Sequence, residues 1–193
     1  MLSYKESLKI LKETDALLEG HFILSSGHHS DKYVQCAKLL SKPEQAKKLC
    51  LSLAEKIREK YEKIDLILSP AIGGIVIGYE IGRILNIETI FAERVNNEFI
   101  LRRGFEIKKG QKTLIVEDVI TTGKSSLECS TLVKKSEGEI VGFACILDRS
   151  NGKSKIDKKI VSQIEIEIPI FKKDDLPKHL KNLKAVKPGS RNI

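Results

Sequence analysis

Residues 114–126 read LIVEDVITTGKSS, and the fold class of the chain is decided by this stretch. Three apolar residues lead into two adjacent carboxylates, Glu117 and Asp118, and two further apolar residues follow them. An apolar run of this length that ends in turn-forming residues predicts a buried strand of a parallel sheet. The segment from Thr121 to Ser125 then predicts a turn that opens a helix, where free backbone N–H groups and the helix dipole favour a phosphate.

Two carboxylates beside a phosphate cradle restrict the ligands that fit it. They would repel an inorganic anion, but they suit a ligand whose hydroxyls donate hydrogen bonds, or one bridged by a cation, and a ribose phosphate with Mg²⁺ meets both conditions. The Gly123-Lys124-Ser125 triplet imitates the end of a P-loop, yet the first glycine of that motif would fall at Asp118. We therefore reject an ATPase. The structural alternative is a buried strand that ends in an acidic turn before a capped helix.

The composition is that of a globular domain predicted to span residues 1–193, with 31% charged and 41% apolar residues. No apolar run approaches the ~20 residues that a membrane helix needs. The charged N-terminus, MLSYKESLKILKET, does not have the pattern of a signal peptide. The four cysteines form no C-x-x-C pair, so neither a zinc site nor a disulfide framework is indicated. We expect a cytoplasmic protein with no membrane partner.

The net charge of +8 is unevenly spread, because eleven Lys and Arg stand against five Asp and Glu from Asn151 onward. A basic tail can indicate nucleic-acid binding. This one has a single aromatic residue, Phe171, so it offers no stacking platform for bases. We expect a solvated lysine-rich face whose field attracts anionic substrates, and no nucleic-acid partner.

Periodicity along the chain predicts strands separated by helices, the pattern of βαβ units and a mostly parallel sheet. The expected helices are residues 4–18, 43–62, 74–85 and 124–135. The expected strands are residues 66–69, 89–92, 113–117, 140–148 and 163–168. Gly74, Gly78 and Gly82 recur every four residues, which predicts a smooth helix face packed closely on the sheet.

The opening segment resembles the signature of the type I phosphoribosyltransferases, which use 5-phosphoribosyl 1-diphosphate (PRPP). The resemblance implies that Glu117 and Asp118 are a catalytic acidic pair that holds the ribose 2- and 3-hydroxyls. It also implies that the residues after the pair bind PRPP around its 5-phosphate: Val119, Ile120, Thr121, Thr122, Gly123, Lys124 and Ser125. Members of the family often have a small residue at the position of Lys124.

A second loop, PAIGG at residues 70–74, stands between an expected strand and an expected helix. Folds of this class bind ligands at the carboxyl ends of their parallel strands, and glycines allow the backbone to approach an anion. The resemblance implies that Ala71, Ile72 and Gly73 bind the diphosphate of PRPP. Taken alone, such a loop is more often a simple tight turn.

Residues 91–112 predict a projecting hairpin with an Asn-Asn turn and a later glycine bend. The resemblance implies a flap that closes over the diphosphate, in which Arg94 binds PRPP while Arg102 and Arg103 are catalytic and neutralise the leaving group. Flaps in this family often serve the neighbouring subunit and carry lysines and a histidine, and residues 94–103 contain neither. The alternative is a solvent-exposed hairpin that carries charge without a catalytic role.

Residues 22–35, FILSSGHHSDKYVQ, resemble the N-terminal segment of orotate phosphoribosyltransferases. Many long-form members have a lysine where this chain has Ser25. His28 and His29 are adjacent and point different ways, so we expect a surface turn and no metal pair. The residues implied in orotate binding by this segment and by the phosphate loop are Ser26, Gly27, Tyr33 and Thr121.

Arg149 follows the expected strand at residues 140–148, at the carboxyl end of the sheet. Orotate differs from the other common bases by a ring carboxylate, which an arginine fork binds through paired, charge-assisted hydrogen bonds. The final segment, AVKPGSR at residues 185–191, also resembles short bacterial and archaeal orotate phosphoribosyltransferases. The likeness therefore extends over nearly the whole chain.

The resemblance implies an α/β type I phosphoribosyltransferase fold: a mostly parallel sheet flanked by helices, a small hood from the N- and C-terminal segments, and a projecting flap hairpin. It implies an enzyme that makes orotidine 5-monophosphate from orotate and PRPP, with Mg²⁺ bound mainly through PRPP and not through protein side chains. A homodimer is expected. The alternatives are an RNA-binding regulator on the same fold and a purine or xanthine phosphoribosyltransferase.

Overall fold

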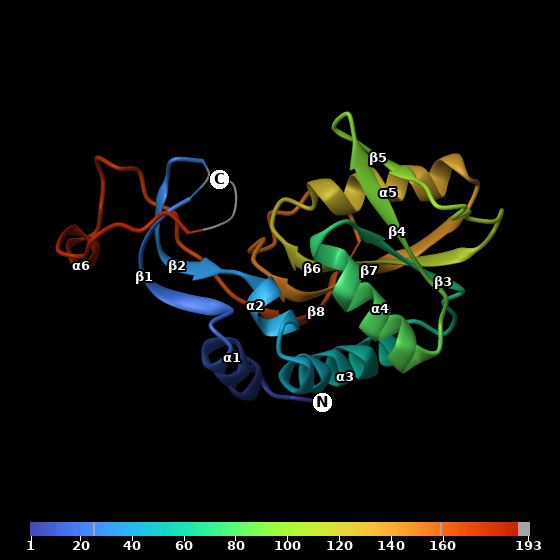
Figure 1. The fold of residues 1–193 in the computed structure, drawn as a ribbon, viewed down its shortest axis with the longest axis horizontal. Coiled ribbons are helices and arrows are strands. Elements are labelled where there is room, and N and C mark those ends of the chain that lie inside the picture. Colours follow the sequence, from blue (N-terminus) through green and yellow to red (C-terminus); the bar gives the residue numbers. More distant parts are fainter. Residues whose placement is uncertain (25, 159, 189–193) are drawn as a thin grey trace.

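The computed structural model describes residues 1–24, 26–158 and 160–188. A central sheet with strand order β5-β4-β3-β6-β7-β8 carries helices on both faces, and β1 and β2 form a separate hairpin (Figure 1). In chain order the elements are α1 (Tyr4–Glu13), β1 (Leu17–Ile23), β2 (His29–Val34), α2 (Cys36–Leu40), α3 (Pro43–Lys60), β3 (Leu66–Pro70), α4 (Gly73–Leu85), β4 (Thr89–Val95), β5 (Glu98–Leu101), β6 (Lys112–Ile120), α5 (Lys124–Lys135), β7 (Glu139–Asp148), β8 (Ile160–Glu165) and α6 (Lys178–Lys181).

The central sheet is parallel except at one edge. β4, β3, β6, β7 and β8 pair in parallel, and β5 pairs antiparallel with β4. The helices α3 and α4 cover one face and α5 covers the other (Figure 1). The α/β class and the mostly parallel sheet predicted from the sequence are confirmed.

Each face of the sheet has its own hydrophobic core, because side chains alternate along a strand. On β3, Ile67 belongs to the core beneath α3 and α4, whereas Leu66 and Leu68 belong to the core beneath α5. On β6, Leu114 and Val116 face the first core and Ile115 faces the second. This double burial explains why the strands are nearly continuous apolar runs.

The predicted helix over residues 4–18 is wrong at its end. A capping box between Ser3 and Glu6 starts α1, but the helix ends at Glu13, and Asp15 turns the chain at φ 54°. Leu17 then begins β1 opposite Val34. The apolar spacing continues past the helix because the next strand also buries its side chains.

Two predicted strands have different bounds in the structure. The strand expected at residues 113–117 continues as β6 to Ile120, so Asp118 lies within the strand together with Glu117 and not beyond its end. The strand expected at residues 163–168 is β8, which begins at Ile160 and ends at Glu165. The helices expected at residues 43–62, 74–85 and 124–135 are present as α3, α4 and α5.

The glycines of α4 allow the close packing that their spacing predicts. A Cβ atom at Gly78 would lie 2.1 Å from Ser69 Oγ, and one at Gly82 would lie 1.9 Å from Thr89 Oγ1. Any larger residue would push α4 off the sheet. Since α4 begins at one of the loops predicted to bind PRPP, these glycines also set the height of that loop above the sheet.

The N-terminal hairpin and the C-terminal segment form a hood beside the main sheet, here defined as β1, β2 and residues 169–186 (Figure 1). Backbone bridges join Phe22 to Val186 and His29 to Phe171. Inside the hood, His21 Nε2 and His29 Nδ1 are 2.6 Å apart. The surface turn predicted for the adjacent histidines is confirmed for His28, which is exposed, and wrong for His29, which is buried.

Candidate active site

Three neighbouring strands end in the segments that the sequence analysis singled out. β3 leads into residues 71–73, β6 leads into residues 121–123, and β7 ends one residue before Arg149. The strands are parallel, so these ends meet at one edge of the sheet. Arg149 N donates to Ile120 O at 2.9 Å, which fixes the end of β7 against the end of β6.

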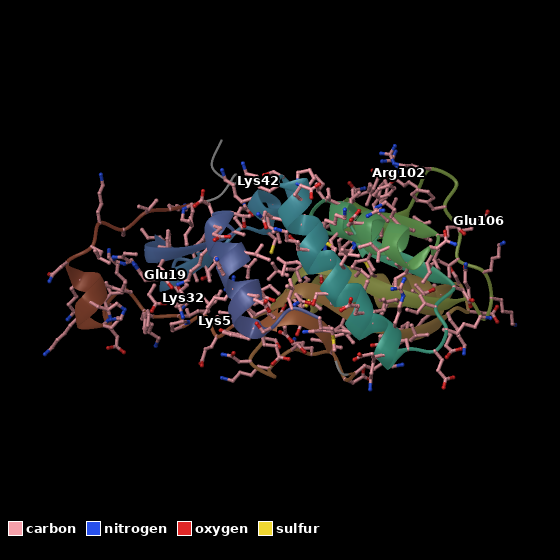
Figure 2. All side chains as sticks on the ribbon, turned by 90° about the horizontal axis from the view of Figure 1, so that it is seen from below. Lys5, Glu19, Lys32, Lys42, Arg102 and Glu106 are labelled. Carbon is pink, nitrogen blue, oxygen red and sulfur yellow. The ribbon has the colours of Figure 1, made fainter. Side chains whose placement is uncertain are left out.

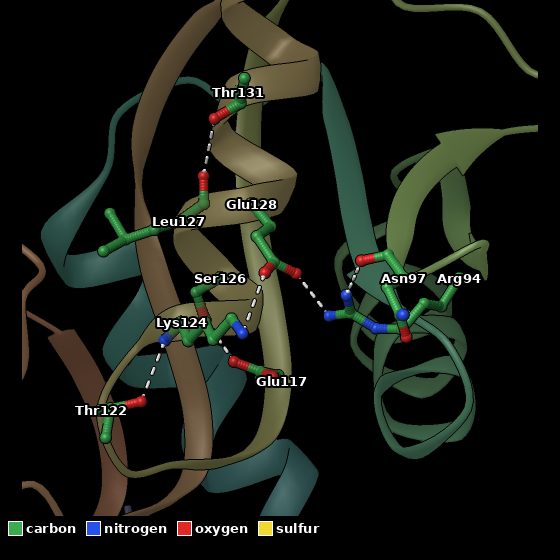
Figure 3. A network of polar contacts seen from close by, with 9 residues as sticks. All are labelled: Arg94, Asn97, Glu117, Thr122, Lys124, Ser126, Leu127, Glu128 and Thr131. Carbon is green, nitrogen blue, oxygen red and sulfur yellow. Dashed lines mark hydrogen bonds and ion pairs between the residues drawn. The ribbon is translucent and has the colours of Figure 1, made fainter.

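The two carboxylates at the end of β6 point to opposite faces of the sheet, because they are consecutive in a strand. Glu117 faces α5 and accepts a short hydrogen bond from Ser126 Oγ (Figure 3). Asp118 faces the start of α4, and a Cβ atom at Gly73 would lie 2.9 Å from its Oδ1. Glycine at position 73 thus allows the loop after β3 to run directly beside Asp118.

Both carboxyls are poorly solvated, which favours their neutral forms. Burial raises the pKa of Glu117 to about 7, against the lowering effect of the Ser126 hydrogen bond. Burial also raises the pKa of Asp118, although backbone N–H groups act in the opposite direction. A ligand that donates hydrogen bonds from hydroxyls would relieve this cost, as a ribose does.

The loop after β6 has the geometry of an anion-binding turn. Gly123 adopts φ 76°, and α5 begins at the next residue. A Cβ atom at Gly123 would lie 2.7 Å from Ile156 Cγ1, so only glycine fits there. The side chains of Thr121, Thr122 and Lys124 are exposed. The turn therefore exposes hydroxyls and an ammonium beside a helix N-terminus.

The loop after β3 is also exposed, at residues 72 and 73. Ala71 N donates to Ala92 O at 2.8 Å, which fixes the loop to β4. The Ala71–Ile72 peptide bond is cis, and Ile72 is 85% exposed. Ala71, Ile72 and Gly73 thus lie at the edge where the acidic pair stands, as the sequence analysis expected.

The predicted hairpin is formed by β4 and β5 and rises beside α5 (Figure 1). Its turn residues Asn96 and Asn97 have φ values of 48° and 66°, as a two-residue hairpin turn of this kind requires. Arg103 Nε donates to Glu93 Oε1 at 2.9 Å, and Arg102 Nη1 lies 3.7 Å from Glu93 Oε2. In this position both arginines are held by a carboxylate of their own hairpin.

Arg149 is half-buried, and its Nε has no hydrogen-bond partner among the described residues. Burial lowers the pKa of the guanidinium, and the nearby Tyr33 acts in the opposite direction. Tyr33 of the hood therefore lies within electrostatic range of Arg149. A half-buried guanidinium with an unused donor is the chemistry expected of a carboxylate-binding site.

Within the part of the chain that the structure describes, two other residues predicted to bind the base, Ser26 and Gly27, have no hydrogen bond that ties them to the rest of the site. Ser26 and Gly27 lie in the turn between β1 and β2, where Gly27 adopts φ 80°. Ser26 Oγ is 3.2 Å from His28 Nδ1. Among the described residues no hydrogen bond joins this turn to Arg149. Ser25 and the residues after 188 lie outside the part that the structure describes.

Two residues on α5 belong to the site and were missed from the sequence. Ser126 donates to Glu117, and Glu128 accepts from Arg94 Nη2 (Figure 3). Glu128 stands four residues after Lys124, and residues at this spacing lie on the same face of a helix. This spacing is a sequence signal from which the role of Glu128 could have been predicted.

Among residues 1–24, 26–158 and 160–188, no group of three or more His, Cys, Asp and Glu side chains could hold a metal ion. Within the same ranges no helix combines the length and apolarity needed to cross a bilayer. All four cysteines are buried as free thiols.

Fold and site together define a phosphoribosyltransferase, and residues 38–179 match the phosphoribosyl transferase domain family. The chain is 48% identical over 189 residues to the orotate phosphoribosyltransferase of Parvibaculum lavamentivorans, a match that covers 96% of this chain and 97% of that protein. It is 46% identical over 188 residues to the protein of the same name from Erythrobacter litoralis, with 97% of each covered. The chain belongs to the orotate phosphoribosyltransferases.

A solved structure has the same fold at low sequence identity. The orotate phosphoribosyltransferase from Aeropyrum pernix superposes with a TM-score of 0.72 at 21% identity, covering 82% of this chain and 92% of that one. This likeness confirms the predicted type I phosphoribosyltransferase fold.

Proposed function

We propose that the protein transfers the 5-phosphoribosyl group of PRPP to orotate, giving orotidine 5-monophosphate and diphosphate in pyrimidine (UMP) biosynthesis. The observation that carries the proposal is the half-buried Arg149 with its unpartnered Nε, one strand away from the acidic pair. Orotate has a ring carboxylate for this guanidinium, which uracil and the purine bases lack. Nearly full-length relatives at 46% and 48% identity have the name orotate phosphoribosyltransferase.

The chemistry needs positioning more than proton transfer. Orotate is an anion whose ring nitrogen is already nucleophilic. The barrier is the bond between the anomeric carbon and the diphosphate oxygen, which breaks with its electron pair leaving on diphosphate while the ring nitrogen bonds to the carbon. The protein lowers this barrier by aligning both substrates and by stabilising the developing charge.

Each part of PRPP has a matching segment at the sheet edge. Glu117 and Asp118 accept hydrogen bonds from the ribose hydroxyls, and Ser126 keeps Glu117 oriented. The turn at residues 121–125 and the N-terminus of α5 bind the 5-phosphate. The loop at residues 71–73 binds the diphosphate through the backbone N–H groups that follow Ala71, whose own N–H donates to Ala92 O.

Mg²⁺ is proposed as the cofactor. The acidic pair and the hydroxyls of residues 121 and 122 make this edge rich in oxygen donors, the ligand type that Mg²⁺ prefers. Because the described residues contain no cluster of three ligands, PRPP and water would supply most of the coordination. When bound, the ion adds positive charge beside the leaving diphosphate.

A homodimer and a flap function for the β4–β5 hairpin are part of the proposal. Ile72, Val76 and Tyr79 are exposed on one side of α4, next to the diphosphate loop, and a second copy of the chain would cover them. Arg102 and Arg103, which follow β5, would exchange Glu93 for diphosphate when this end of the flap closes, while the hairpin turn stays in place. A cytoplasmic location is supported by the four free, buried thiols, which a reducing compartment preserves.

The proposed function is tested by PRPP-dependent loss of orotate absorbance, with uracil, adenine, hypoxanthine and xanthine as alternative bases. We expect turnover of orotate alone, together with stoichiometric release of diphosphate. Turnover of a purine without orotate would establish the purine alternative. RNA binding that persists at raised salt, without turnover of any base, would favour the regulator, since binding driven by phosphates weakens steeply with ionic strength.

A further inference from the structure

The carboxylate of Glu128 is the point where the flap hairpin meets the phosphate loop. Its Oε2 accepts a short hydrogen bond from Arg94 Nη2 of β4, and its Oε1 lies 3.8 Å from Lys124 Nζ (Figure 3). Arg94 and Glu128 are 34 residues apart in the sequence. One side chain therefore touches two cations that belong to two different parts of the proposed PRPP site.

Arg94 also has two contacts within its own hairpin. Its Nη1 donates to Asn97 O in the hairpin turn at 2.5 Å, and its guanidinium lies 4.1 Å from the centre of the Phe99 ring. Three contacts of different kinds therefore hold one guanidinium. Through Arg94, Glu128 joins the tip of the hairpin to the first turns of α5.

The two cations are held very differently. The side chain of Lys124 is 78% exposed and too far from Glu128 for a hydrogen bond, whereas those of Arg94 and Glu128 are 35% and 29% exposed and in direct contact. An arriving phosphate can draw Lys124 away at little cost, because exposed ion pairs contribute little to stability. The Arg94–Glu128 pair would remain in place.

We propose that Glu128 is a positioning residue, which holds the hairpin in register with the phosphate loop through Arg94 while Lys124 stays free to reach the 5-phosphate. The inference rests on the proposed function, since it assigns Glu128 a part in PRPP use. Glu128 itself contacts no substrate in this account. The β4–β5 hairpin lies beside α5 in Figure 1, and Figure 3 shows the contact between Arg94 and Glu128 that joins the two.

Steady-state kinetics of Glu128→Gln separate positioning from simple electrostatics. Removal of the negative charge makes the phosphate loop more positive, which on charge alone would tighten PRPP binding. If Glu128 positions the hairpin, kcat falls about tenfold, within the cost of a misplaced catalytic group, while KM for PRPP does not rise. An unchanged kcat, or a rise in KM alone, would overturn the inference.

The matched control is Glu137→Gln, which makes the same charge change just beyond the far end of α5. Glu137 pairs with Lys109 at 2.6 Å, and both side chains are well exposed. We expect wild-type kcat and KM for this variant. A further variant, Arg94→Ala combined with Glu128→Gln, should have the kcat of Arg94→Ala alone, because the two residues act as one unit. Additive losses would contradict the pair.

Amide hydrogen exchange in the β4–β5 hairpin gives a readout that does not depend on activity. Arg102, the residue after β5, lies at the surface of the molecule in Figure 2. In the substrate-free protein, Glu128→Gln should speed exchange in residues 95–101 about fivefold, the equivalent of about 1 kcal/mol, and leave β6 unchanged. Unchanged exchange in the hairpin would overturn the inference even if the enzyme is active. If wild type fails to turn over orotate, the proposed function fails and the exchange experiment still decides whether Glu128 anchors the hairpin.

Discussion

The phosphate side and the base side of the site are held in place by different kinds of contact. On the phosphate side, Glu117, Asp118 and residues 121–125 follow one another along a single strand, turn and helix. On the base side, Arg149 comes from the end of β7, and Tyr33 comes from a hood that is itself closed by residues 169–186. The first is local in sequence, and the second is assembled over more than a hundred residues.

This difference assigns a separate task to each side. The phosphate side has carboxyls whose pKa is raised by burial and which cost stability until a ribose binds them. The base side has one half-buried guanidinium with an unused donor, on the side of the sheet end that the hood adjoins. We therefore expect changes on the phosphate side to affect PRPP use and the pH dependence of stability, and changes on the base side to affect the use of orotate and not that of PRPP.

The largest expected effect is on stability, through Glu117→Gln. The pKa of Glu117 is about 7 in the folded chain, whereas an unfolded chain has the ordinary value near 4.5. Wild type therefore loses stability as pH rises from about 4.5 to about 7, by up to about 3 kcal/mol. The amide does not titrate, so the variant should be more stable by about that amount at pH 8 and equal to wild type below about pH 4.5.

Urea unfolding at several pH values measures this difference directly. A variant that is destabilised at pH 8 would show that the carboxylate is well solvated in the fold, which would contradict the account of the phosphate side. The activity of Glu117→Gln should fall, because a neutral amide is a weaker acceptor for the ribose hydroxyls.

Asp118→Asn should lower kcat/KM for PRPP by about a hundredfold, because a charge-assisted hydrogen bond to ribose is worth about 1.5–3 kcal/mol. KM for orotate should change little. Initial rates with each substrate varied in turn check this, and circular dichroism checks the fold. Near-normal kcat/KM for PRPP would remove Asp118 from the ribose site.

Arg149→Ala should raise KM for orotate about thirtyfold, within the range for loss of a charged hydrogen-bond partner, and leave KM for PRPP nearly unchanged. The same initial-rate measurements give both constants. Equal effects on both substrates would place Arg149 outside the base site. Arg149→Lys is the control: it keeps the charge without the fork, so its effect should lie in between.

The flap arginines provide a test of whether the flap of one subunit acts at the site of the other. Arg102→Ala and Arg103→Ala together should lower kcat about tenfold or more by removing charge that faces the diphosphate. Mixed in equal amounts with Asp118→Asn and allowed to exchange subunits, the double variant should restore about a quarter of wild-type activity if flaps work in trans, because half of the dimers then hold one intact site. No recovery, with exchange verified by a mass tag, would place each flap over its own site.

Ser30→Ala should have the smallest effect. Ser30 Oγ donates to Pro169 O at 2.7 Å and ties β2 to the C-terminal segment. Its loss should cost about 1 kcal/mol and should raise KM for orotate without changing KM for PRPP. A variant that loses PRPP affinity would show that the hood also shapes the phosphate side.

The sequence predicted the phosphate side well because its signals are local. Adjacent carboxylates after an apolar run, then a glycine turn, define strand, loop and helix without any distant contact. The end of α1 at Glu13 was missed because the buried strand after it continues the apolar spacing. Ser126 and Glu128 were missed because their partners, Glu117 and Arg94, are reached only through packing of α5 on the sheet.

The hood was predicted as a whole but not in its parts. Nothing near His29 in the sequence shows that its backbone pairs with Phe171 or that its ring meets His21. The pairing with Phe171 depends on where the chain returns 142 residues later, whereas the contact with His21, eight residues away, depends on how β1 and β2 pair in the hairpin. The same holds for Arg149, whose position after a strand was readable but whose burial beside Tyr33 was not.

The central claim is that phosphate and base are bound by separate regions, and hydrogen exchange with two ligands tests it most directly. Ribose 5-phosphate carries only the phosphate-side groups, and orotidine 5-monophosphate adds the base. We predict that ribose 5-phosphate protects residues 117–126 alone, and that orotidine 5-monophosphate adds protection in residues 26–34 and 149–152. Identical protection by the two ligands, or protection of the hood by ribose 5-phosphate, would contradict the account.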